Sequence, residues 1–131
     1  MRRLLLALLL ALPACLTAFG ASVDGIKINS AVTGKGPTLI FVHGWTCDSS
    51  SWDAQVPEFA KNYRVITLDL PGHGKSGLPQ DGKFSVDLFA KAVEAVRAEA
   101  GADKVVLIGH SMGAPVIRQY AHNYPSHVAG L

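Results

Sequence analysis

The stretch VVLIGHSMGAP, Val105–Pro115, decides the fold of this 131-residue chain. Four apolar residues run into a serine that is flanked by Gly109 and Gly113, and a helical pattern follows. If a strand turns sharply into a helix at Ser111, the backbone two residues before it and two residues after it approach closely, so only glycine fits at both places. The pattern therefore predicts a serine hydroxyl exposed at the carboxyl edge of a sheet, at a helix N-terminus. An ordinary turn is the alternative, and the coincidence of strand, helix and both glycines disfavours it.

A helix N-terminus at this point suits acyl transfer, because that reaction generates an oxyanion. A free backbone N–H such as that of Met112 can stabilise the developing charge, and the loss of one such donor typically costs about 3 kcal/mol. We expect a second donor from the segment FVHGW, where His43 and Gly44 close a buried strand and the Trp45 N–H can point to the same place. A purely packing role for Trp45 is the alternative.

The rest of the chain alternates strand and helix patterns. Val23–Val32 is expected to form a hairpin or an edge pair of strands. Strands buried on both faces are expected in three apolar runs, Thr38–Gly44, Tyr63–Gly72 and Lys104–Gly109. Another apolar run begins at His127. Helices are expected within Ser49–Asn62, where Pro57 limits the helix, in Phe84–Gly101 with Ser85 as its cap, and in Met112–Tyr124. The packing face of the second helix is expected to contain Phe89, Val93, Val96 and Ala100. This alternation predicts one α/β domain with a mostly parallel sheet flanked by helices.

Residues 1–20 have the order of a secretory signal peptide. Two arginines precede the apolar run Leu4–Leu12, and small residues close the segment at Gly20. A membrane-spanning helix needs about 20 apolar residues, so the run is too short for an anchor. We expect an exported protein, periplasmic or secreted, with residues 21–131 as its mature part and no stable membrane span after cleavage. The alternative is a lipoprotein anchored at Cys15.

Charge and cysteine content narrow the classes of partner and cofactor. Outside the leader, ten basic residues balance ten acidic ones, so the chain has no basic stripe for nucleic acid. Cys47 is the single cysteine after the leader, which leaves no pair for an internal disulfide. No His, Cys, Asp or Glu cluster has the spacing of metal ligands, and we expect no metal. The segment GHGKSG, Gly72–Gly77, fits a nucleotide-binding glycine pattern, but Pro79 prevents a helix from opening there, so we expect no cofactor.

Three motifs together resemble the α/β-hydrolase family: HGW at 43–45, DLPGHGKS at 69–76 and GHSMG at 109–113. The resemblance covers nearly all of the chain after the leader. It implies a serine hydrolase that cleaves small or medium carboxylic esters through an acyl-enzyme, with Ser111 as the nucleophile. It also implies that the N–H groups of Trp45 and Met112 are the oxyanion donors. The departure is Ala114-Pro115, where many members have a second glycine, and it affects local packing.

Other activities share these motifs. The front half of a thioesterase, lactonase, peptidase, carbon–carbon bond hydrolase or cofactor-free perhydrolase would look similar, as would a non-catalytic binding protein that retains the fold. Ser111 disfavours the dehalogenases and epoxide hydrolases of this fold, because they carry aspartate at the same place. We expect a small-molecule acyl or ester substrate, and the sequence leaves the oligomeric state open.

A general base for Ser111 is not evident among the five histidines, His43, His73, His110, His122 and His127. His110, beside the serine, should point away from it. His122 lies about 16 Å from Ser111 along the helix and His127 lies farther still, so both are out of hydrogen-bond reach. His43 and His73 lie in loops and are expected to shape those loops by hydrogen bonds.

The carboxylates of this part of the chain have other expected roles. Asp69 is expected to form a turn and Asp87 to complement a helix dipole. The family places its acid and base after later strands, so we predict that residues 21–131 are the N-terminal half of the domain, catalytically silent alone.

Overall fold

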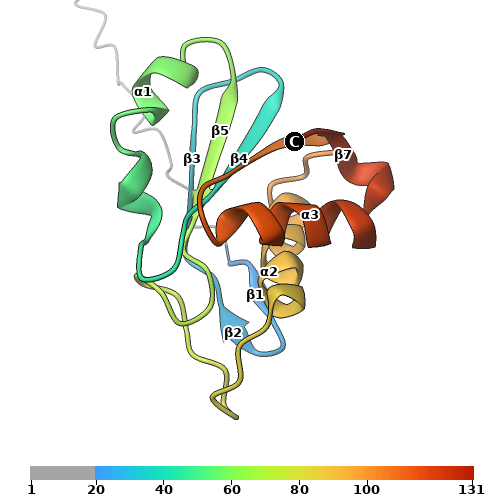
Figure 1. Ribbon diagram of the computed structural model, residues 1–131. Coiled ribbons are helices and arrows are strands. Elements are labelled where there is room, and N and C mark those ends of the chain that lie inside the picture. Colours follow the sequence, from blue (N-terminus) through green and yellow to red (C-terminus); the bar gives the residue numbers. More distant parts are fainter. Residues whose placement is uncertain (1–19) are drawn as a thin grey trace, which may run out of the picture.

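The computed structural model describes residues 20–131 (Figure 1). The predicted signal peptide, residues 1–20, lies outside the described residues except for Gly20. Strands and helices alternate along the chain in the order that the sequence predicts. Within the described part, no helix is both long and apolar enough to cross a membrane.

A five-stranded sheet forms the centre of the fold, with the strand order β3-β5-β4-β6-β7. The strands are β3 Ser30–Thr33, β4 Thr38–Val42, β5 Arg64–Leu68, β6 Val105–Gly109 and β7 Val128–Gly130. β3 runs antiparallel to β5, and the other neighbours are parallel. A separate hairpin joins β1, Ser22–Val23, to β2, Ile26–Lys27. Its turn residues Asp24 and Gly25 have φ values of 49° and 77°, as a tight two-residue hairpin requires.

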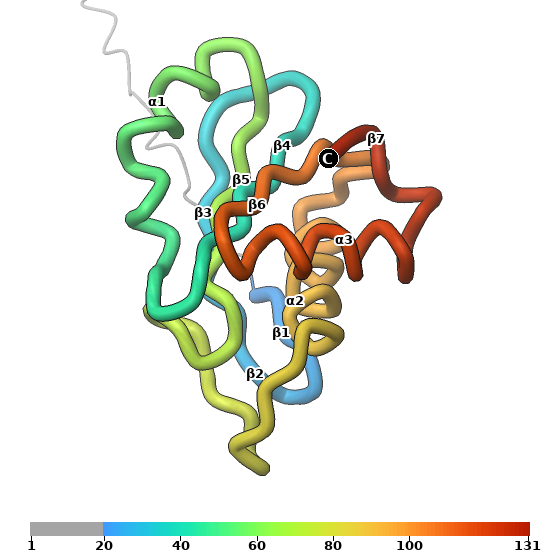
Figure 2. The backbone as a smooth tube through the Cα atoms, viewed as in Figure 1, coloured from blue at the N-terminus to red at the C-terminus, as the bar shows by residue number. Residues whose placement is uncertain are grey.

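Two long helices cover one face of this sheet, namely α2, Val86–Glu99, and α3, Gly113–Asn123. Figure 2 shows both on one side of the strands and the short α1, Val56–Phe59, on the other. Ser85 caps α2 by accepting a hydrogen bond from the Leu88 N–H at 3.0 Å, as predicted.

The helical pattern within Ser49–Asn62 forms two short pieces, the 3₁₀ helix η1, Ser49–Trp52, and α1. Pro57 lies in the first turn of α1, the place where its missing N–H has no helical partner to lose. A second 3₁₀ turn, η2, Pro125–His127, leads into β7.

Successive side chains of a strand point to opposite faces of the sheet, so the apolar side chains are divided between two cores. In β4, Ile40 and Val42 join the large core with α2 and α3, whereas Leu39 and Phe41 belong to a small core on the opposite face. The prediction that β6 is buried on both faces is wrong for the second face. There, Val106 and Ile108 are half-buried, because the described elements that cover this side are only η1 and α1.

Polar contacts hold the two long helices together. Glu94 in α2 accepts hydrogen bonds from Arg97 at 2.7 Å and from the Tyr120 hydroxyl of α3 at 2.7 Å. Asn123, at the end of α3, donates to Asp87 at 2.9 Å, and Asp87 lies in the first turn of α2, as predicted. Burial and the hydrogen bond to Glu94 raise the pKa of the Tyr120 hydroxyl above its ordinary value. These contacts fix the direction of α3 and, with it, the position of its N-terminus.

Candidate active site

The chain reverses sharply between β6 and α3. β6 ends at Gly109, α3 begins at Gly113, and Ser111 between them has a φ of +53°. This is the left-handed region, which disfavours residues other than glycine and costs about 1–3 kcal/mol for a residue such as serine. Ser111 is exposed, so the predicted turn from strand to helix exists and presents the serine to solvent.

The two glycines that flank the serine are required by close backbone contacts. A Cβ at Gly109 would lie 2.6 Å from the Gly113 carbonyl oxygen, and a Cβ at Gly113 would collide with the Val42 carbonyl of β4. Real Cβ atoms do not approach backbone atoms this closely. The expected close approach of strand and helix accounts for Gly109, whereas Gly113 is required by its contact with β4, which the sequence did not predict.

The loop that follows β4 lies directly beside the serine. A Cβ at Gly44 would lie 3.1 Å from the Ser111 Cβ, and the His110 N–H donates to the Val42 carbonyl at 3.1 Å. β4 and β6 are parallel neighbours whose last residues, Val42 and Gly109, are paired in register. The structure therefore brings His43, Gly44 and Trp45 together with the turn at 109–113.

Two backbone amides in these segments, those of Trp45 and Met112, have no acceptor of their own. Within residues 20–131, neither the Trp45 N–H nor the Met112 N–H donates a hydrogen bond to another residue. The Trp45 side chain is 55% exposed, and its ring contacts the rings of His73 and Phe84 edge-on at centroid distances of 5.1 and 6.4 Å. The side chain therefore packs at the surface rather than in the core.

His43 is fully buried at the start of this loop. Its Nε2 accepts a hydrogen bond from the Leu70 N–H at 3.0 Å, and its Nδ1 lies 2.7 Å from the Gly44 carbonyl oxygen. Burial lowers the pKa of His43, although the contact with Gly44 acts in the opposite direction. Both ring nitrogens are thus engaged, which agrees with the predicted role in shaping the loop. His73 uses its Nδ1 in the same way, 3.0 Å from the Pro71 carbonyl.

Asp69 holds three segments together, which is more than the turn that the sequence predicts. Its buried carboxylate accepts hydrogen bonds from the Ser49 N–H at 2.7 Å, the Lys75 N–H at 2.9 Å and the Asn29 side-chain amide at 2.9 Å. Burial acts to raise the pKa of Asp69, but these hydrogen bonds outweigh it and the pKa lies below its ordinary value. The carboxylate therefore ties the loop after β4 to the loop after β5.

Sequence reasoning missed the partners of Asp69. Asn29 and Ser49 lie 40 and 20 residues from it along the chain. It also missed Thr46, whose φ of +62° places a second strained residue near the serine. Of these residues, only Asp69 could have been noticed in the sequence, because it is a carboxylate that directly follows a buried strand. A threonine in a left-handed conformation leaves no mark in the sequence.

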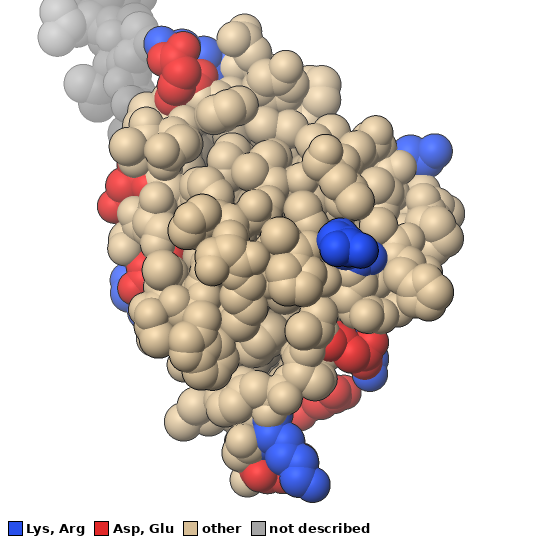
Figure 3. Space-filling model, in the orientation of Figure 1, with Lys and Arg blue, Asp and Glu red and all other residues tan. Residues whose placement is uncertain are grey.

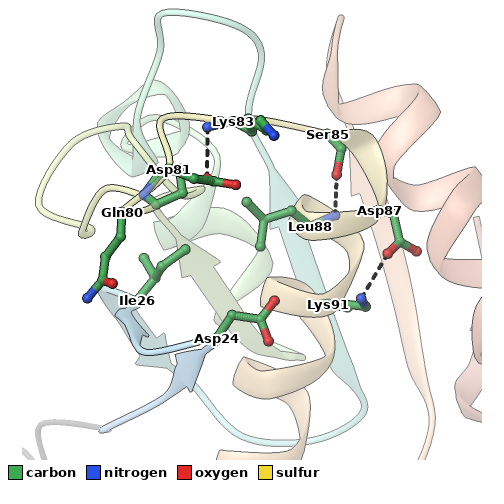
Figure 4. Close-up of a pocket in the computed structure, with 10 residues that line it drawn as sticks. Asp24, Ile26, Gln80, Asp81, Lys83, Ser85, Asp87, Leu88 and Lys91 are labelled. Atoms are coloured by element: carbon green, nitrogen blue, oxygen red, sulfur yellow. Dashed lines mark hydrogen bonds and ion pairs between the residues drawn. The ribbon is translucent and has the colours of Figure 1, made fainter.

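Of two hollows, one lies beside these segments and the other lies away from them. One, of about 280 Å³, is lined by Cys47, Ser51, Trp52, Gln55 and His110, on the side of η1. The other, of about 380 Å³, lies between the β1–β2 hairpin, the loop 79–85 and α2 (Figure 4). Most of the polar groups drawn there are paired, as Asp87 is with Lys91 at 3.0 Å, and no residue of the turn at Ser111 lines it.

Charged side chains, and the side chains of the types that can bind metals, do not gather at one place in the described part of the chain. Figure 3 shows a largely uncharged face, with most Lys, Arg, Asp and Glu side chains near its edges. Within residues 20–131, no group of three or more His, Cys, Asp and Glu side chains is placed to hold a metal ion. Cys47 is a free thiol.

Comparisons with known proteins place this geometry in a family. The sequence pattern of the alpha/beta hydrolase fold matches residues 37–131. The chain is 38% identical over 106 residues to a bifunctional esterase/perhydrolase of Acinetobacter calcoaceticus, covering 79% of this chain and 38% of that protein. It is 30% identical to epoxide hydrolase 3 of Mus musculus, covering 79% of this chain and 29% of that protein.

A solved structure agrees with the sequence matches. The thermophilic esterase from Thermogutta terrifontis superimposes with a TM-score of 0.79 at 31% identity, covering 86% of this chain and 42% of that structure. The chain spans about a third of the length of the curated relatives it matches. The matched pattern covers the whole sheet except β3, and both long helices. The chain therefore belongs to the alpha/beta hydrolase fold family.

Proposed function

We propose that this chain carries the nucleophile of a serine hydrolase that cleaves small-molecule carboxylic esters. The observation that carries the proposal is Ser111 itself: an exposed serine in strained backbone geometry, followed by Met112 and packed against Gly44, the residue before Trp45. Neither the Met112 N–H nor the Trp45 N–H donates a hydrogen bond within the described residues. Strain of this kind persists where the surrounding structure enforces it, and such sites are frequently functional.

In the proposed reaction, the Ser111 Oγ attacks the ester carbonyl carbon, and the carbonyl oxygen becomes an oxyanion. The N–H groups of Trp45 and Met112 donate hydrogen bonds to that oxygen, and the N-terminus of α3 adds its positive partial charge. A general base takes the Ser111 proton during the attack and returns it to the departing alcohol when the intermediate collapses, which leaves an acyl group on Ser111. Water then releases the acid by the same steps in reverse order.

The base and its carboxylate partner are proposed to lie outside these 131 residues. His43 has both ring nitrogens engaged, and the Nδ1 of His73 faces the Pro71 carbonyl. The chain also covers only about a third of its curated relatives. Residues 21–131 alone are therefore expected to hydrolyse esters at no more than the residual rate that oxyanion stabilisation supplies.

Carboxylic esters are favoured over epoxides although relatives of both kinds match the chain. The hydroxyl of a serine at position 111 attacks a carbonyl carbon and forms an acyl-enzyme, whereas the epoxide hydrolases that resemble this chain carry aspartate at the same position. A thioesterase, a lactonase, a peptidase and a cofactor-free perhydrolase on the same fold are the related alternatives. A non-catalytic binding protein is the alternative from another class.

The test uses the complete protein that contains this chain. A fluorophosphonate probe is expected to label it covalently, and p-nitrophenyl acetate is expected to be hydrolysed. Ser111→Ala should abolish the labelling and reduce kcat by about 10³-fold or more. Ser126→Ala, at an exposed serine of η2, is the matched control and should label like the wild type. Persistent labelling of the Ser111→Ala variant would refute the nucleophile, and absent labelling of the wild type would favour the binding protein.

We also propose that residues 1–20 direct export. N-terminal sequencing of the protein recovered from the periplasm or medium should begin at Ala21. A lipid-modified N-terminus at Cys15 would instead identify a lipoprotein.

A further inference from the structure

The orientation of the Trp45 amide depends on the carbonyl of the residue before it. The Gly44 C=O and the Trp45 N–H belong to one planar trans peptide, so they point in opposite directions. Whatever fixes the Gly44 carbonyl also fixes the Trp45 N–H. Gly44 lies beside the serine, since a Cβ there would be 3.1 Å from the Ser111 Cβ.

The hydrogen bonds of His43 determine where its proton lies. The Leu70 N–H can only donate, so the Nε2 that lies 3.0 Å from it must be an acceptor. In a neutral imidazole the proton is then on Nδ1. That nitrogen lies 2.7 Å from the Gly44 oxygen, so it donates to this carbonyl.

The turn at Gly44–Cys47 is strained, so a hydrogen bond from His43 to the Gly44 carbonyl helps to hold it. The Cys47 N–H also donates to the Gly44 oxygen, at 3.2 Å, and closes a turn in which Thr46 has a φ of +62°. A left-handed threonine costs about 1–3 kcal/mol, so the turn is strained by itself. The carbonyl has two lone pairs, and His43 uses the second.

The loop is also anchored at its far end by the residue that precedes Leu70. The Ser49 N–H donates to the Asp69 carboxylate at 2.7 Å. Adjacent residues at the start of the loop after β5 therefore hold both ends of the segment 43–49. One end is held through the His43 ring, and the other directly.

We propose that His43 is a positioning residue for the oxyanion site: the Leu70 N–H orients its ring, and its Nδ1–H pins the Gly44 carbonyl so that the Trp45 N–H faces the reacting oxygen. This inference rests on the proposed function. His43 does not touch the substrate in this arrangement, and acts through the peptide between Gly44 and Trp45.

Two substitutions in the complete protein separate the two nitrogens. In His43→Asn, the side-chain NH₂ is attached to Cγ as Nδ1 is, so the donor to Gly44 is retained and the acceptor for Leu70 is lost. In His43→Gln, the amide lies one carbon farther out, so an acceptor can reach the Leu70 N–H and the donor to Gly44 is lost. His122→Asn and His122→Gln, at an exposed histidine of α3, are the matched controls.

Hydrolysis of p-nitrophenyl acetate is expected to respond to the lost donor. His43→Gln should lower kcat about 10²-fold with little change in KM, because negative charge develops on the oxygen only as the bond to Ser111 forms and is absent from the bound substrate. His43→Asn should lose less than about tenfold, and both His122 variants should match the wild type. Equal losses in the two His43 variants, or no loss in His43→Gln, would overturn the positioning role. If Ser111→Ala stays active, the proposed function itself fails, whichever way the His43 variants behave.

A measurement on the wild-type protein is independent of how the variants fold. Nitrogen-15 NMR of the histidine-labelled protein reports which ring nitrogen carries the proton. We expect His43 to be the neutral Nδ1–H tautomer, hydrogen-bonded to a carbonyl. A proton on Nε2 would overturn the inference.

Discussion

Gly113 tests how tightly α3 is seated against β4. A Cβ at this position would collide with the Val42 carbonyl oxygen and would lie 3.0 Å from the Val42 carbonyl carbon and 3.1 Å from the His43 oxygen. All three are backbone atoms of paired segments, so none can rotate away. Alanine should gain up to about 1 kcal/mol in helix propensity. The forced separation should cost about 3 kcal/mol, at the upper end for an overpacked core.

The Gly113→Ala substitution is therefore expected to destabilise the complete protein by about 2 kcal/mol, the difference between these two effects. For a large domain this corresponds to a fall in Tm of about 4–8 °C, measured by thermal unfolding followed by circular dichroism. Gly130→Ala in β7 is the matched control, because among residues 20–131 its Cβ would meet only Val106 methyl carbons, at 3.7 and 3.8 Å. That variant should change Tm by less than about 2 °C. If Gly113→Ala unfolds at or above the wild-type temperature, the close contact between the start of α3 and β4 is refuted.

Two further substitutions test the polar contacts of the fold. Asp69→Asn removes an acceptor from a buried carboxylate and should lower the free energy of unfolding by about 1–3 kcal/mol at pH 7. Because the folded-state pKa of Asp69 is lowered, its stabilisation is present above the unfolded pKa of about 4 and is lost as the pH falls through the folded value. The difference between wild type and variant in urea unfolding should thus shrink from pH 7 to pH 3, and a constant difference would contradict an ionised carboxylate. Ser85→Ala removes the cap of α2 and should cost about 1 kcal/mol, with faster hydrogen exchange at the Leu88 amide, whereas Ser85→Asp should retain protection. Unchanged exchange at Leu88 in Ser85→Ala would show that the cap contributes nothing.

The parts of the fold that sequence reasoning predicted correctly depend on short-range constraints. The turn at Ser111 follows from two glycines four residues apart, and the cap at Ser85 follows from a serine directly before a helical pattern. Both constraints act within a few residues, where local geometry leaves few solutions. Pro57, by contrast, lies in the first turn of α1, so it permits that helix to begin and, contrary to the expectation from the sequence, does not account for its end at Phe59.

The parts that it missed depend on which strands become neighbours. The sequence predicts a parallel sheet but not the order β5-β4-β6, so it cannot show that Val42 ends beside Gly109. The contacts of His43 with Leu70 and of Asp69 with Asn29 span 27 and 40 residues. The half-exposure of Ile108 has the same origin, since an apolar run does not tell what covers each face.

The strand order also explains why the candidate site lies where it does. From β4, the next strand along the chain, β5, lies on one side, and β6 lies on the other. The loops that leave β4 and β6 therefore diverge to opposite faces, and the space between the carboxyl ends of these two strands is free of a crossing connection, as is general for binding sites in parallel sheets. Two of the three non-glycine residues with positive φ in the described part, Thr46 and Ser111, lie in these two loops. The strain thus lies at the carboxyl ends of β4 and β6, next to the buried contacts of His43, Asp69 and Gly113.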